Sequence, residues 1–310
     1  MKVLVIRFSS IGDIVLTTPV LRCLHQQKGA EVHFLTKPTF TTILQNNPHV
    51  THVISLHNDI KDTIALLTKE HYDFVVDLQR NLRSRRITLA LRTRHKAFPK
   101  EDLRRILSVV LKKDCCTGRS VVERFFEAVK PLGIEDDKKG LECFFPDEKP
   151  QFENYVALVC GAQHATKQIP VEKLKLICQR SPRTIVLLGG KAEAEQLKDV
   201  SFSENAVNLC GKTTLAQSAN LIRHAANVVT PDTGMMHIAA AYQKDIIAIW
   251  GCTTPQMGFF PFRTPHHNME CTLRCRPCSR FGFKQCPKKH YKCMMQQDWE
   301  HIISIINHEY

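Results

Sequence analysis

The sequence lacks several features that would place it in other classes of protein. No run of apolar residues approaches the roughly 20 that a helix needs to cross a bilayer. The longest apolar helical stretch, from Leu103 to Leu111, carries two arginines. A signal peptide is not predicted, because Arg7 and Asp13 interrupt the apolar amino-terminal segment too early. Internal repeats and low-complexity tracts are also missing. We therefore predict a globular protein of the cytosol.

Acidic residues are few compared with basic ones. The 310 residues include 43 Lys and Arg against 30 Asp and Glu, which gives a formal net charge of +13. Such a surface attracts polyanions, including nucleic acids, anionic lipid headgroups and phosphorylated substrates. Much of the basic charge is concentrated in residues 80–86, 92–105 and 274–292. The charge alone does not decide among these partners.

Short strand-like runs alternate with amphipathic segments of helical length in both halves of the chain. This pattern predicts the α/β class, with two doubly wound, Rossmann-like domains. The polar stretch Glu135–Asn154 is the expected linker, so we place the domains at residues 1–150 and 151–310. The predicted strands are Val3–Phe8, Glu31–Thr36, His52–Leu56, Phe74–Leu78, Tyr155–Cys160, Thr184–Leu188, Ala206–Leu209, Asn227–Thr230 and Ile246–Trp250.

The loop after the first predicted strand, Ser9–Asp13, holds a candidate catalytic residue. Ligands of open α/β sheets bind beyond the carboxyl ends of the strands, where such loops lie. Gly12 permits a tight turn before a helix that we expect to run to about Gln27, with a kink at Pro19. Asp13 is either a helix cap or a base that takes a proton from an acceptor hydroxyl.

A second candidate loop runs from Val229 to His237 and leads into an alanine-rich helix. Thr233 and Gly234 offer a hydroxyl and backbone N–H groups at the positive end of that helix, which suits a diphosphate. His237 is either a buried structural histidine or a group that faces the ligand.

Two further loops follow strands of the second half. Gly161–Pro170 carries Lys167, a cation that can offset the charge of a departing diphosphate. Gly189-Gly190 precedes Glu193, a carboxylate placed to accept hydrogen bonds from ribose hydroxyls. A Gly-Gly pair after a strand is, however, often only a turn.

Four segments together resemble the bacterial lipopolysaccharide heptosyltransferases, a family of inverting transferases that use ADP-heptose. The resemblance covers nearly the whole chain in the same order. It implies the GT-B fold, in which two Rossmann-like domains face each other across a cleft, the first binding the acceptor and the second the nucleotide-sugar. The segments are KVLVIRFSSIGDIVLTTPVL, DLQRNLRS, LCGKTTLAQSANLIRHA and VVTPDTGMMHIAAAYQKDIIAIWGCTTP.

The resemblance also implies a role for individual residues. Asp13 matches the catalytic base, and Lys167 matches the lysine that binds the diphosphate and assists its departure. One position departs from the family, because Ala162-Gln163 stand where members often have a Thr or Ser pair. The other donor-binding positions are Glu193, Thr213, Asp232, Thr233, Gly234, Met235 and His237. The acceptor-binding positions are Ser10, Gly12, Arg80 and Arg83.

The implied reaction is the transfer of heptose from ADP-heptose to the inner core of lipopolysaccharide. The acceptor is either Kdo-lipid A or a core that already carries heptose. No cofactor is expected, and the chain has no Asp-x-Asp motif for a catalytic metal. The basic stretch from Arg80 to Arg105 is either a contact with the anionic cytoplasmic face of the inner membrane or an ordinary solvated surface.

Five of the 13 cysteines fall between residues 271 and 293. Four of them could form a structural zinc site, and reduced thiols or redox-dependent disulfides are the alternatives. The four candidate zinc ligands are Cys275, Cys278, Cys286 and Cys293.

Two other functions stay open at this stage. The fold alone does not select heptose or adenine, so a GT-B enzyme with another nucleotide-sugar is possible. A basic nucleic-acid-binding protein with a zinc knuckle is less favoured, because its aromatic residues are few and it would not need the Asp-Thr-Gly-x-x-His loop. No nucleic-acid partner is therefore expected.

Overall fold

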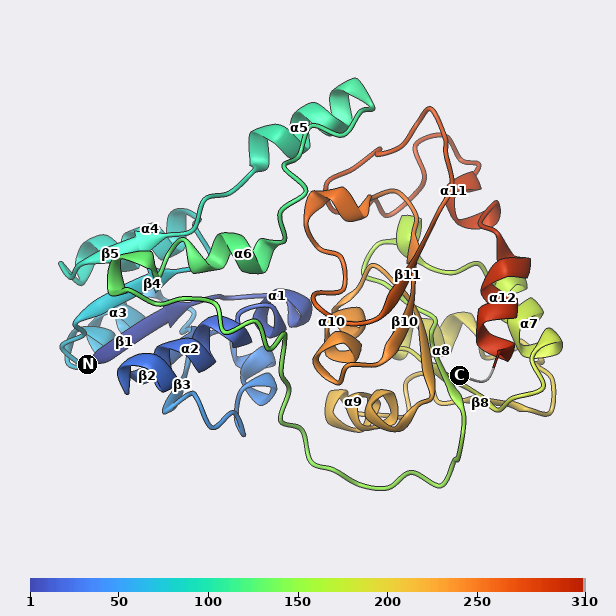
Figure 1. Ribbon diagram of the computed structural model, residues 1–310, viewed down its shortest axis with the longest axis horizontal. Coiled ribbons are helices and arrows are strands. Elements are labelled where there is room, and N and C mark those ends of the chain that lie inside the picture. Colours follow the sequence, from blue (N-terminus) through green and yellow to red (C-terminus); the bar gives the residue numbers. More distant parts are fainter. Residues whose placement is uncertain (309–310) are drawn as a thin grey trace. The chain divides into compact units, whose positions relative to one another are not determined.

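Two parallel β-sheets with helices between their strands organise residues 1–308, the residues that the computed structural model describes (Figure 1). Each sheet belongs to its own compact unit. The first unit contains residues 1–101 and 119–144, and the second contains residues 102–118 and those from 145 onward. The predicted α/β class with two parallel sheets is confirmed.

The first unit has a five-stranded sheet in the order β3-β2-β1-β4-β5, and all its neighbouring strands are parallel. This doubly wound order reverses direction between β1 and β4. The strands are β1 (Lys2–Ile6), β2 (Glu31–Thr36), β3 (His52–Ser55), β4 (Phe74–Asp77) and β5 (His95–Ala97). The helices are α1 (Ile11–Val15), α2 (Thr18–Lys28), α3 (Ile60–Thr68), α4 (Leu82–Ala90) and α6 (Val121–Phe126), with 3₁₀ turns η1 (Pro38–Ile43) and η2 (Lys130–Leu132).

The second unit has a six-stranded parallel sheet in the order β11-β10-β9-β6-β7-β8, which reverses between β6 and β9. Its strands are β6 (Val156–Val159), β7 (Ile185–Leu188), β8 (Ala206–Asn208), β9 (Asn227–Pro231), β10 (Asp245–Trp250) and β11 (His266–Glu270). Its helices are α5 (Asp102–Leu111), α7 (Val171–Arg180), α8 (Lys191–Gln196), α9 (Leu215–His224), α10 (Gly234–Ala241), α11 (Lys292–Met295) and α12 (Trp299–Asn307), with 3₁₀ turns η3 (Ala165–Lys167) and η4 (Pro255–Met257). Within residues 1–308, no helix has the length and apolar character needed to span a bilayer.

The central strands are apolar because both of their faces are covered. β1 reads Lys-Val-Leu-Val-Ile and β7 reads Ile-Val-Leu-Leu, and the four apolar residues of each are buried. Continuous apolar runs of this kind are typical of parallel strands covered on both faces. All nine predicted strands form, with ends within two residues of the predicted ones.

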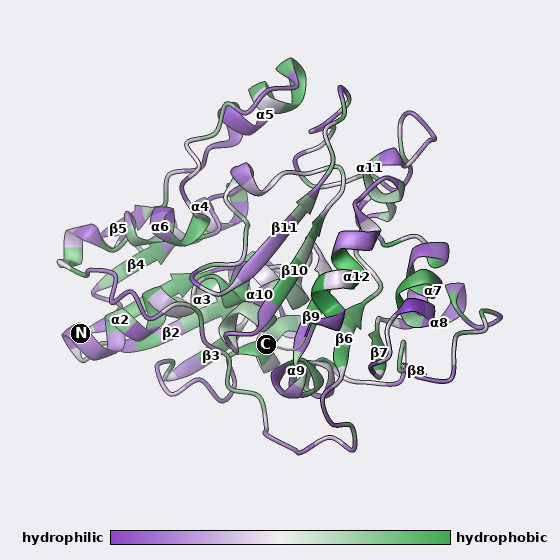
Figure 2. Cartoon of the chain, turned by 45° about the vertical axis from the view of Figure 1, so that its right-hand side comes forward, coloured by the Kyte–Doolittle hydropathy of each residue, from purple (hydrophilic) through white to green (hydrophobic). Residues whose placement is uncertain are grey.

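Two strands at sheet edges are missing from the sequence prediction. These are β5, with the sequence His-Lys-Ala, and β11, with the sequence His-His-Asn-Met-Glu. Both are polar, as Figure 2 shows for β11. An edge strand has one unpaired side and does not need the β-branched, apolar run by which the other strands are recognised.

The single helix predicted after the first loop is wrong, because the segment forms two helices, α1 and α2. The hydroxyl groups of Thr17 and Thr18 donate to the carbonyl oxygens of Ile14 (2.7 Å) and Val15 (2.8 Å), where they compete with helical N–H donors. Pro19 is the second residue of α2, a position at which proline fits without distorting the helix. The predicted kink at Pro19 is therefore also wrong.

A buried arginine ties the end of the first unit to α2. Arg22 donates to both carboxylate oxygens of Asp137 (2.7 and 2.8 Å), to Glu142 (2.7 Å) and to the carbonyl oxygen of Gly140 (2.9 Å). The hydrogen bonds from Arg22 lower the pKa of Asp137 to about 2. The carboxylates belong to residues 135–154, the predicted linker, which contains no helix or strand. This part of the chain is therefore held by charge rather than by regular structure.

Replacing Arg22 by Met should lower the free energy of unfolding by about 3–5 kcal/mol, because Asp137 and Glu142 would lose their buried counter-charge. Urea denaturation at neutral pH measures the change. The matched control is Arg180→Met, which removes an exposed ion pair with Glu300 and should cost no more than about 1 kcal/mol. Equal losses in both variants would contradict this interpretation.

Candidate functional site

Each sheet reverses its strand order once, and the candidate residues lie around these two reversals. In the first unit, Asp13 lies in α1, just after β1, and Arg80 lies in the loop after β4. In the second unit, the loops after β6 and β9 carry Lys167 and Asp232. Ligands of doubly wound sheets bind in the crevice that such a reversal opens at the carboxyl ends of the strands. The topology thus provides one binding region in each unit.

Asp13 takes part in a network at the start of α1. Its Oδ2 accepts hydrogen bonds from the backbone N–H and the hydroxyl of Ser10, both at 3.0 Å, and its Oδ1 lies 2.6 Å from the guanidinium of Arg7. Ser10 is the N-cap residue and Asp13 is the third residue of the helix, so the two form a capping box. Gly12 is a helical residue without a left-handed conformation, so the predicted tight turn at Gly12 is wrong.

The network determines the charge of Asp13. Burial favours the neutral carboxyl group, but Arg7 and the hydrogen bonds from Ser10 outweigh burial and hold the pKa of Asp13 below its ordinary value. The side chain remains 20% exposed. Asp13 is therefore an ionised carboxylate at neutral pH that a ligand can still reach. The cap and the base, which the sequence leaves as alternatives, are compatible in one residue.

Arg80 lines an open pocket of about 660 Å³ in the first unit. Arg80 has a left-handed backbone (φ 47°), and its N–H donates to Asp77 Oδ1 at 2.7 Å just after β4. Arg83 is an exposed residue of α4 and does not line this pocket. The pocket is lined by Arg80, His95, Lys96, Ala97, Pro99, Glu127, Lys130 and Pro131.

This pocket is suited to an anionic ligand. Arg80, Lys96 and Lys130 supply three cationic groups, and Glu127 supplies the one acidic group of the lining. Glu127 already pairs with Lys130 at 3.1 Å and with Arg119 at 3.1 Å. The sequence does not single out Lys130, because this residue lies far along the chain from the basic stretch and reaches the pocket only through the fold.

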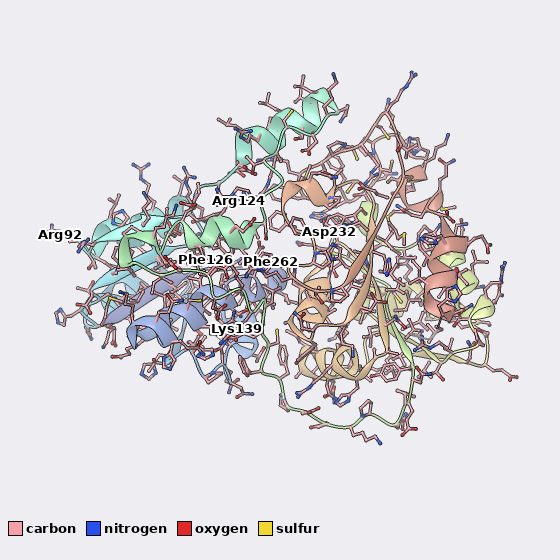
Figure 3. The ribbon with its side chains drawn as sticks, viewed as in Figure 1. Arg92, Arg124, Phe126, Lys139, Asp232 and Phe262 are labelled. Carbon is pink, nitrogen blue, oxygen red and sulfur yellow. The ribbon has the colours of Figure 1, made fainter. Side chains whose placement is uncertain are left out.

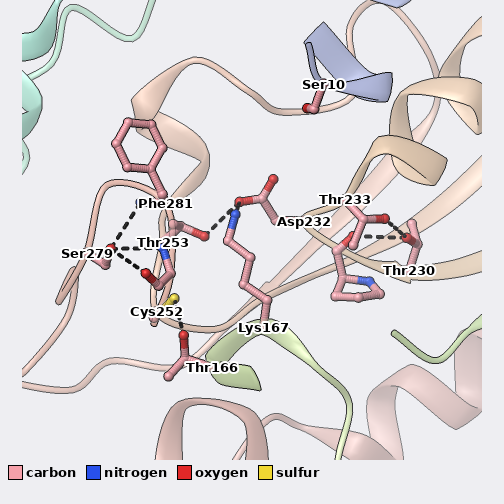
Figure 4. Close-up of polar contacts among 12 residues, drawn as sticks. Ser10, Thr166, Lys167, Thr230, Asp232, Thr233, Cys252, Thr253, Ser279 and Phe281 are labelled. Carbon is pink, nitrogen blue, oxygen red and sulfur yellow. Dashed lines mark hydrogen bonds and ion pairs between the residues drawn. The ribbon is translucent and has the colours of Figure 1, made fainter. Parts of the chain in front are cut away.

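An ion pair crosses the reversal point of the second sheet. Lys167 Nζ lies 2.5 Å from Asp232 Oδ2, and Thr253 Oγ1 donates to the same oxygen at 2.8 Å (Figure 4). Asp232 directly follows β9 (Figure 3), Lys167 ends the η3 turn after β6, and Thr253 follows β10. The side chains of Lys167 and Asp232 are each 13% exposed. Three loops therefore meet at one carboxylate.

Helix α10 begins two residues after this carboxylate. Thr233 is its N-cap residue and Gly234 is its first residue, so the free N–H groups of the first turn lie next to the Lys167–Asp232 pair. The hydroxyl groups of Thr230 and Thr233 are 3.3 Å apart. Met235 is partly exposed in the same turn, whereas His237 is buried. An ammonium group beside the positive end of a helix is suited to phosphate binding.

Glu193 lies close to the Lys167 loop. Its carboxylate accepts from the N–H of Gly190 (2.9 Å) and from the side-chain amide of Gln168 (3.3 Å). The side chain passes over Gly161, where an added Cβ would come within 2.1 Å of Glu193 Cδ. Thr213 is engaged separately, because its hydroxyl group lies 2.7 Å from that of Ser218 on α9.

The cysteine-rich segment supplies a residue that sequence reasoning missed. Arg276 is buried and donates to the carbonyl oxygens of Gly251 (2.6 Å), Thr253 (3.0 Å) and Cys271, and to the Glu270 carboxylate (3.1 Å). It thereby fixes the loop after β10 that positions the Thr253 hydroxyl. The sequence gives no sign of this role, because Arg276 stands among many other basic residues.

In the same segment, Cys275 Sγ lies 4.0 Å from His290 Nε2. Among residues 1–308, one group of three or more His, Cys, Asp or Glu side chains brings its ligand atoms within 4.8 Å of one another. This group consists of Glu31, His33 and His52 in the first unit. The four candidate zinc ligands do not form a group as compact as this one, and the zinc site stays one of the alternatives that the cysteine spacing allows. The cysteines predicted to bind zinc were Cys275, Cys278, Cys286 and Cys293.

Two of these cysteines are engaged elsewhere. Cys293 is buried in the apolar core of the second unit, and the Cys278 thiol is hydrogen-bonded to Cys252. That hydrogen bond lowers the pKa of Cys252 to about 7, and the Thr166 hydroxyl group, 3.2 Å from the sulfur, contributes to the shift. All 13 cysteines are free thiols.

Replacing Arg276 by Lys should lower the free energy of unfolding by about 1–3 kcal/mol, because one ammonium group cannot serve the four acceptors of the buried guanidinium. Thermal and urea denaturation measure this change. The control is Arg274→Lys, the same substitution at an exposed position two residues earlier, which should change stability by less than about 0.5 kcal/mol. If Arg276→Lys leaves the free energy of unfolding unchanged, Arg276 does not anchor this loop.

Known proteins match this architecture. The family model described as glycosyltransferase family 9 (heptosyltransferase) matches residues 63–292. Lipopolysaccharide heptosyltransferase 1 of Campylobacter coli is 24% identical over 289 residues, which cover 82% of this chain and 84% of that protein. Lipooligosaccharide heptosyltransferase 2 of Campylobacter jejuni is 31% identical over 144 residues, and the match spans less than half (43%) of either chain. The solved structure of Escherichia coli ADP-heptose lps heptosyltransferase II superposes with a TM-score of 0.70 at 17% identity, covering 98% of this chain and 99% of that one.

Proposed function

Because the chain belongs to glycosyltransferase family 9, the heptosyltransferases, we propose that it transfers heptose from ADP-heptose to the inner core of lipopolysaccharide. The observation that carries this proposal is the Lys167–Asp232 pair at the start of α10, at the reversal point of the second sheet. A cation beside a helix N-terminus at such a point is the arrangement that a nucleoside diphosphate needs. The acceptor sugar is Kdo on lipid A or a heptose already attached to the core.

In this proposal the second unit binds the donor. Lys167 and the first turn of α10 hold the diphosphate, and Asp232 keeps the lysine in place until the donor arrives. Glu193 accepts from the ribose hydroxyls, and Thr213 lines the adenosine pocket. Thr233, Gly234, Met235 and His237 complete the loop around the phosphates and the sugar.

The first unit binds the acceptor. Arg80, with Lys96 and Lys130 in the same pocket, attracts its anionic groups, and the exposed Arg83 adds to the positive potential. Ser10 and Gly12 shape the loop that presents Asp13. This division assigns acceptor binding to residues 1–150 and donor binding to residues 151–310.

The chemistry follows from where charge develops. As the sugar leaves, negative charge accumulates on the phosphates, where Lys167 and the N–H groups of α10 stabilise it. The acceptor hydroxyl attacks the opposite face of the sugar and loses its proton to Asp13, whose ionised state suits a base. One direct displacement inverts the anomeric centre, and this scheme uses no cofactor and no metal. A lipid-linked acceptor would bring the enzyme to the cytoplasmic face of the inner membrane.

The reaction can be tested with purified protein, ADP-heptose and defined truncated lipopolysaccharides that end in Kdo or in heptose. We expect a mass increase of one heptose on one of these acceptors, together with release of ADP. A parallel panel of UDP-, GDP- and dTDP-sugars tests the other nucleotide-sugars. Transfer from one of those donors, with none from ADP-heptose, would overturn the choice of donor while leaving the family unchanged.

Replacing Asp13 by Asn should lower kcat by about 10²–10⁴-fold, because the base can no longer accept the proton. The dissociation constant for ADP-heptose should stay within about twofold, since Asp13 belongs to the acceptor unit. Steady-state kinetics and calorimetry separate these two quantities. The matched control is Asp62→Asn, at an exposed position in the first turn of α3, which should leave both unchanged. Full turnover in Asp13→Asn would refute the assignment of the base.

A further inference from the structure

Helix α5 is oriented against the usual rule for a surface helix, because its polar side faces the protein. Arg105 donates to the carbonyl oxygen of Met257 at 2.9 Å, and its guanidinium lies 4.6 Å from the centre of the Phe259 ring. Beyond the end of the helix, Lys112 donates to the carbonyl oxygen of Pro277 at 3.0 Å. Charged side chains therefore attach α5 to the second unit.

The opposite side of α5 is an exposed apolar stripe. Large apolar residues occupy positions i, i+3, i+4, i+7 and i+8, the spacing of one helix face. Figure 2 shows the apolar colouring along α5. Five of the eleven large apolar side chains that are exposed among the described residues lie on this one helix. They are Leu103 (78% exposed), Ile106 (41%), Leu107 (47%), Val110 (67%) and Leu111 (55%).

A stripe of this kind calls for a partner. Five large aliphatic side chains left in water are a substantial cost in free energy unless something binds them. An ordinary surface helix turns such a stripe toward the core. Contiguous exposed apolar patches mark sites that bind proteins or membranes.

The charges around the stripe favour a lipid surface. Residues 102–113 contain four basic residues and one acidic residue, and Arg104, Lys112 and Lys113 are exposed. The acidic residue, Asp102, is drawn toward Arg280 at 3.8 Å. A second copy of this helix would bring like charges together, and ten residues offer far less than the ~800 Å² per partner of a stable protein interface. Basic residues beside an apolar stripe are instead typical of interfacial helices on anionic membranes.

We propose that α5 is a membrane-docking helix whose apolar stripe inserts into the surface of an anionic phospholipid bilayer. At about 1.5 Å per residue it is too short to cross the bilayer, so it lies in the interface plane. Arg104 and Lys113 bind phosphate headgroups, while Arg105 and Lys112 hold the helix on the protein. The inference rests on the proposed function only in that the acceptor of that reaction is a membrane lipid.

The first experiment measures binding of the full chain to sedimented vesicles of phosphatidylethanolamine and phosphatidylglycerol, and to vesicles of phosphatidylcholine. We expect binding to the anionic vesicles that weakens with salt, and little binding to phosphatidylcholine. The double variant Leu103→Ser, Val110→Ser should have a vesicle partition coefficient at least about tenfold lower than that of the native chain. The control is Leu82→Ser, Leu89→Ser, which removes two equally exposed leucines from α4 and should bind as the native chain does.

A second measurement reports insertion directly. The tryptophan emission of Val110→Trp should shift to the blue when anionic vesicles are added, and brominated lipid should quench it. The emission of Leu82→Trp should show neither change. Absence of vesicle binding by the native chain, or equal losses in both double variants, would overturn the proposal. The proposal would also be overturned if the native chain forms dimers and the α5 double variant does not, because the stripe would then bind a second copy of the chain.

Activity on a water-soluble, deacylated core acceptor separates this inference from the proposed reaction. The α5 double variant should keep native turnover on that acceptor and lose activity only on acceptors embedded in vesicles. If the native chain binds vesicles through α5 but transfers no heptose to any acceptor, the proposed function fails and the docking helix stands. If it transfers heptose to the soluble acceptor without binding vesicles, the opposite holds.

Discussion

The ion pair between Lys167 and Asp232 is the contact on which the arrangement of the second unit's ligand edge depends. It joins the loops after β6 and β9, the two strands between which the sheet reverses its order. Thr253, in the loop after β10, donates to the same carboxylate. Arg276 then fixes that loop by donating to the carbonyl oxygens of Gly251 and Thr253. The cysteine-rich segment therefore supports this edge of the sheet through Arg276.

The first unit also has an ion pair between an aspartate and a cation at its reversal point. There the reversal point carries a carboxylate, Asp13, whose ionisation depends on Arg7 and on the N-cap residue Ser10. The contacts that begin helix α1 are thus also the contacts that keep the carboxylate charged.

How far the sequence predicts this molecule depends on which signal a feature leaves. Buried parallel strands leave continuous apolar runs, so the central strands were predicted, whereas the polar edge strands β5 and β11 leave no such signal. The resemblance to a known family pointed to Lys167 and Asp232, but their direct contact is a property of the folded chain. The zinc interpretation, one of three alternatives, rests on cysteine spacing alone, and spacing does not show that Cys293 is buried in the core of the second unit.

The position of the Glu193 carboxylate has a less visible consequence. It occupies the space above Gly161, and no other residue type could stand at position 161 without displacing it. Gly161 itself has no side chain. A mutational survey would nevertheless find this glycine as intolerant as a binding residue, because what it contributes is the volume that it leaves empty for its neighbour.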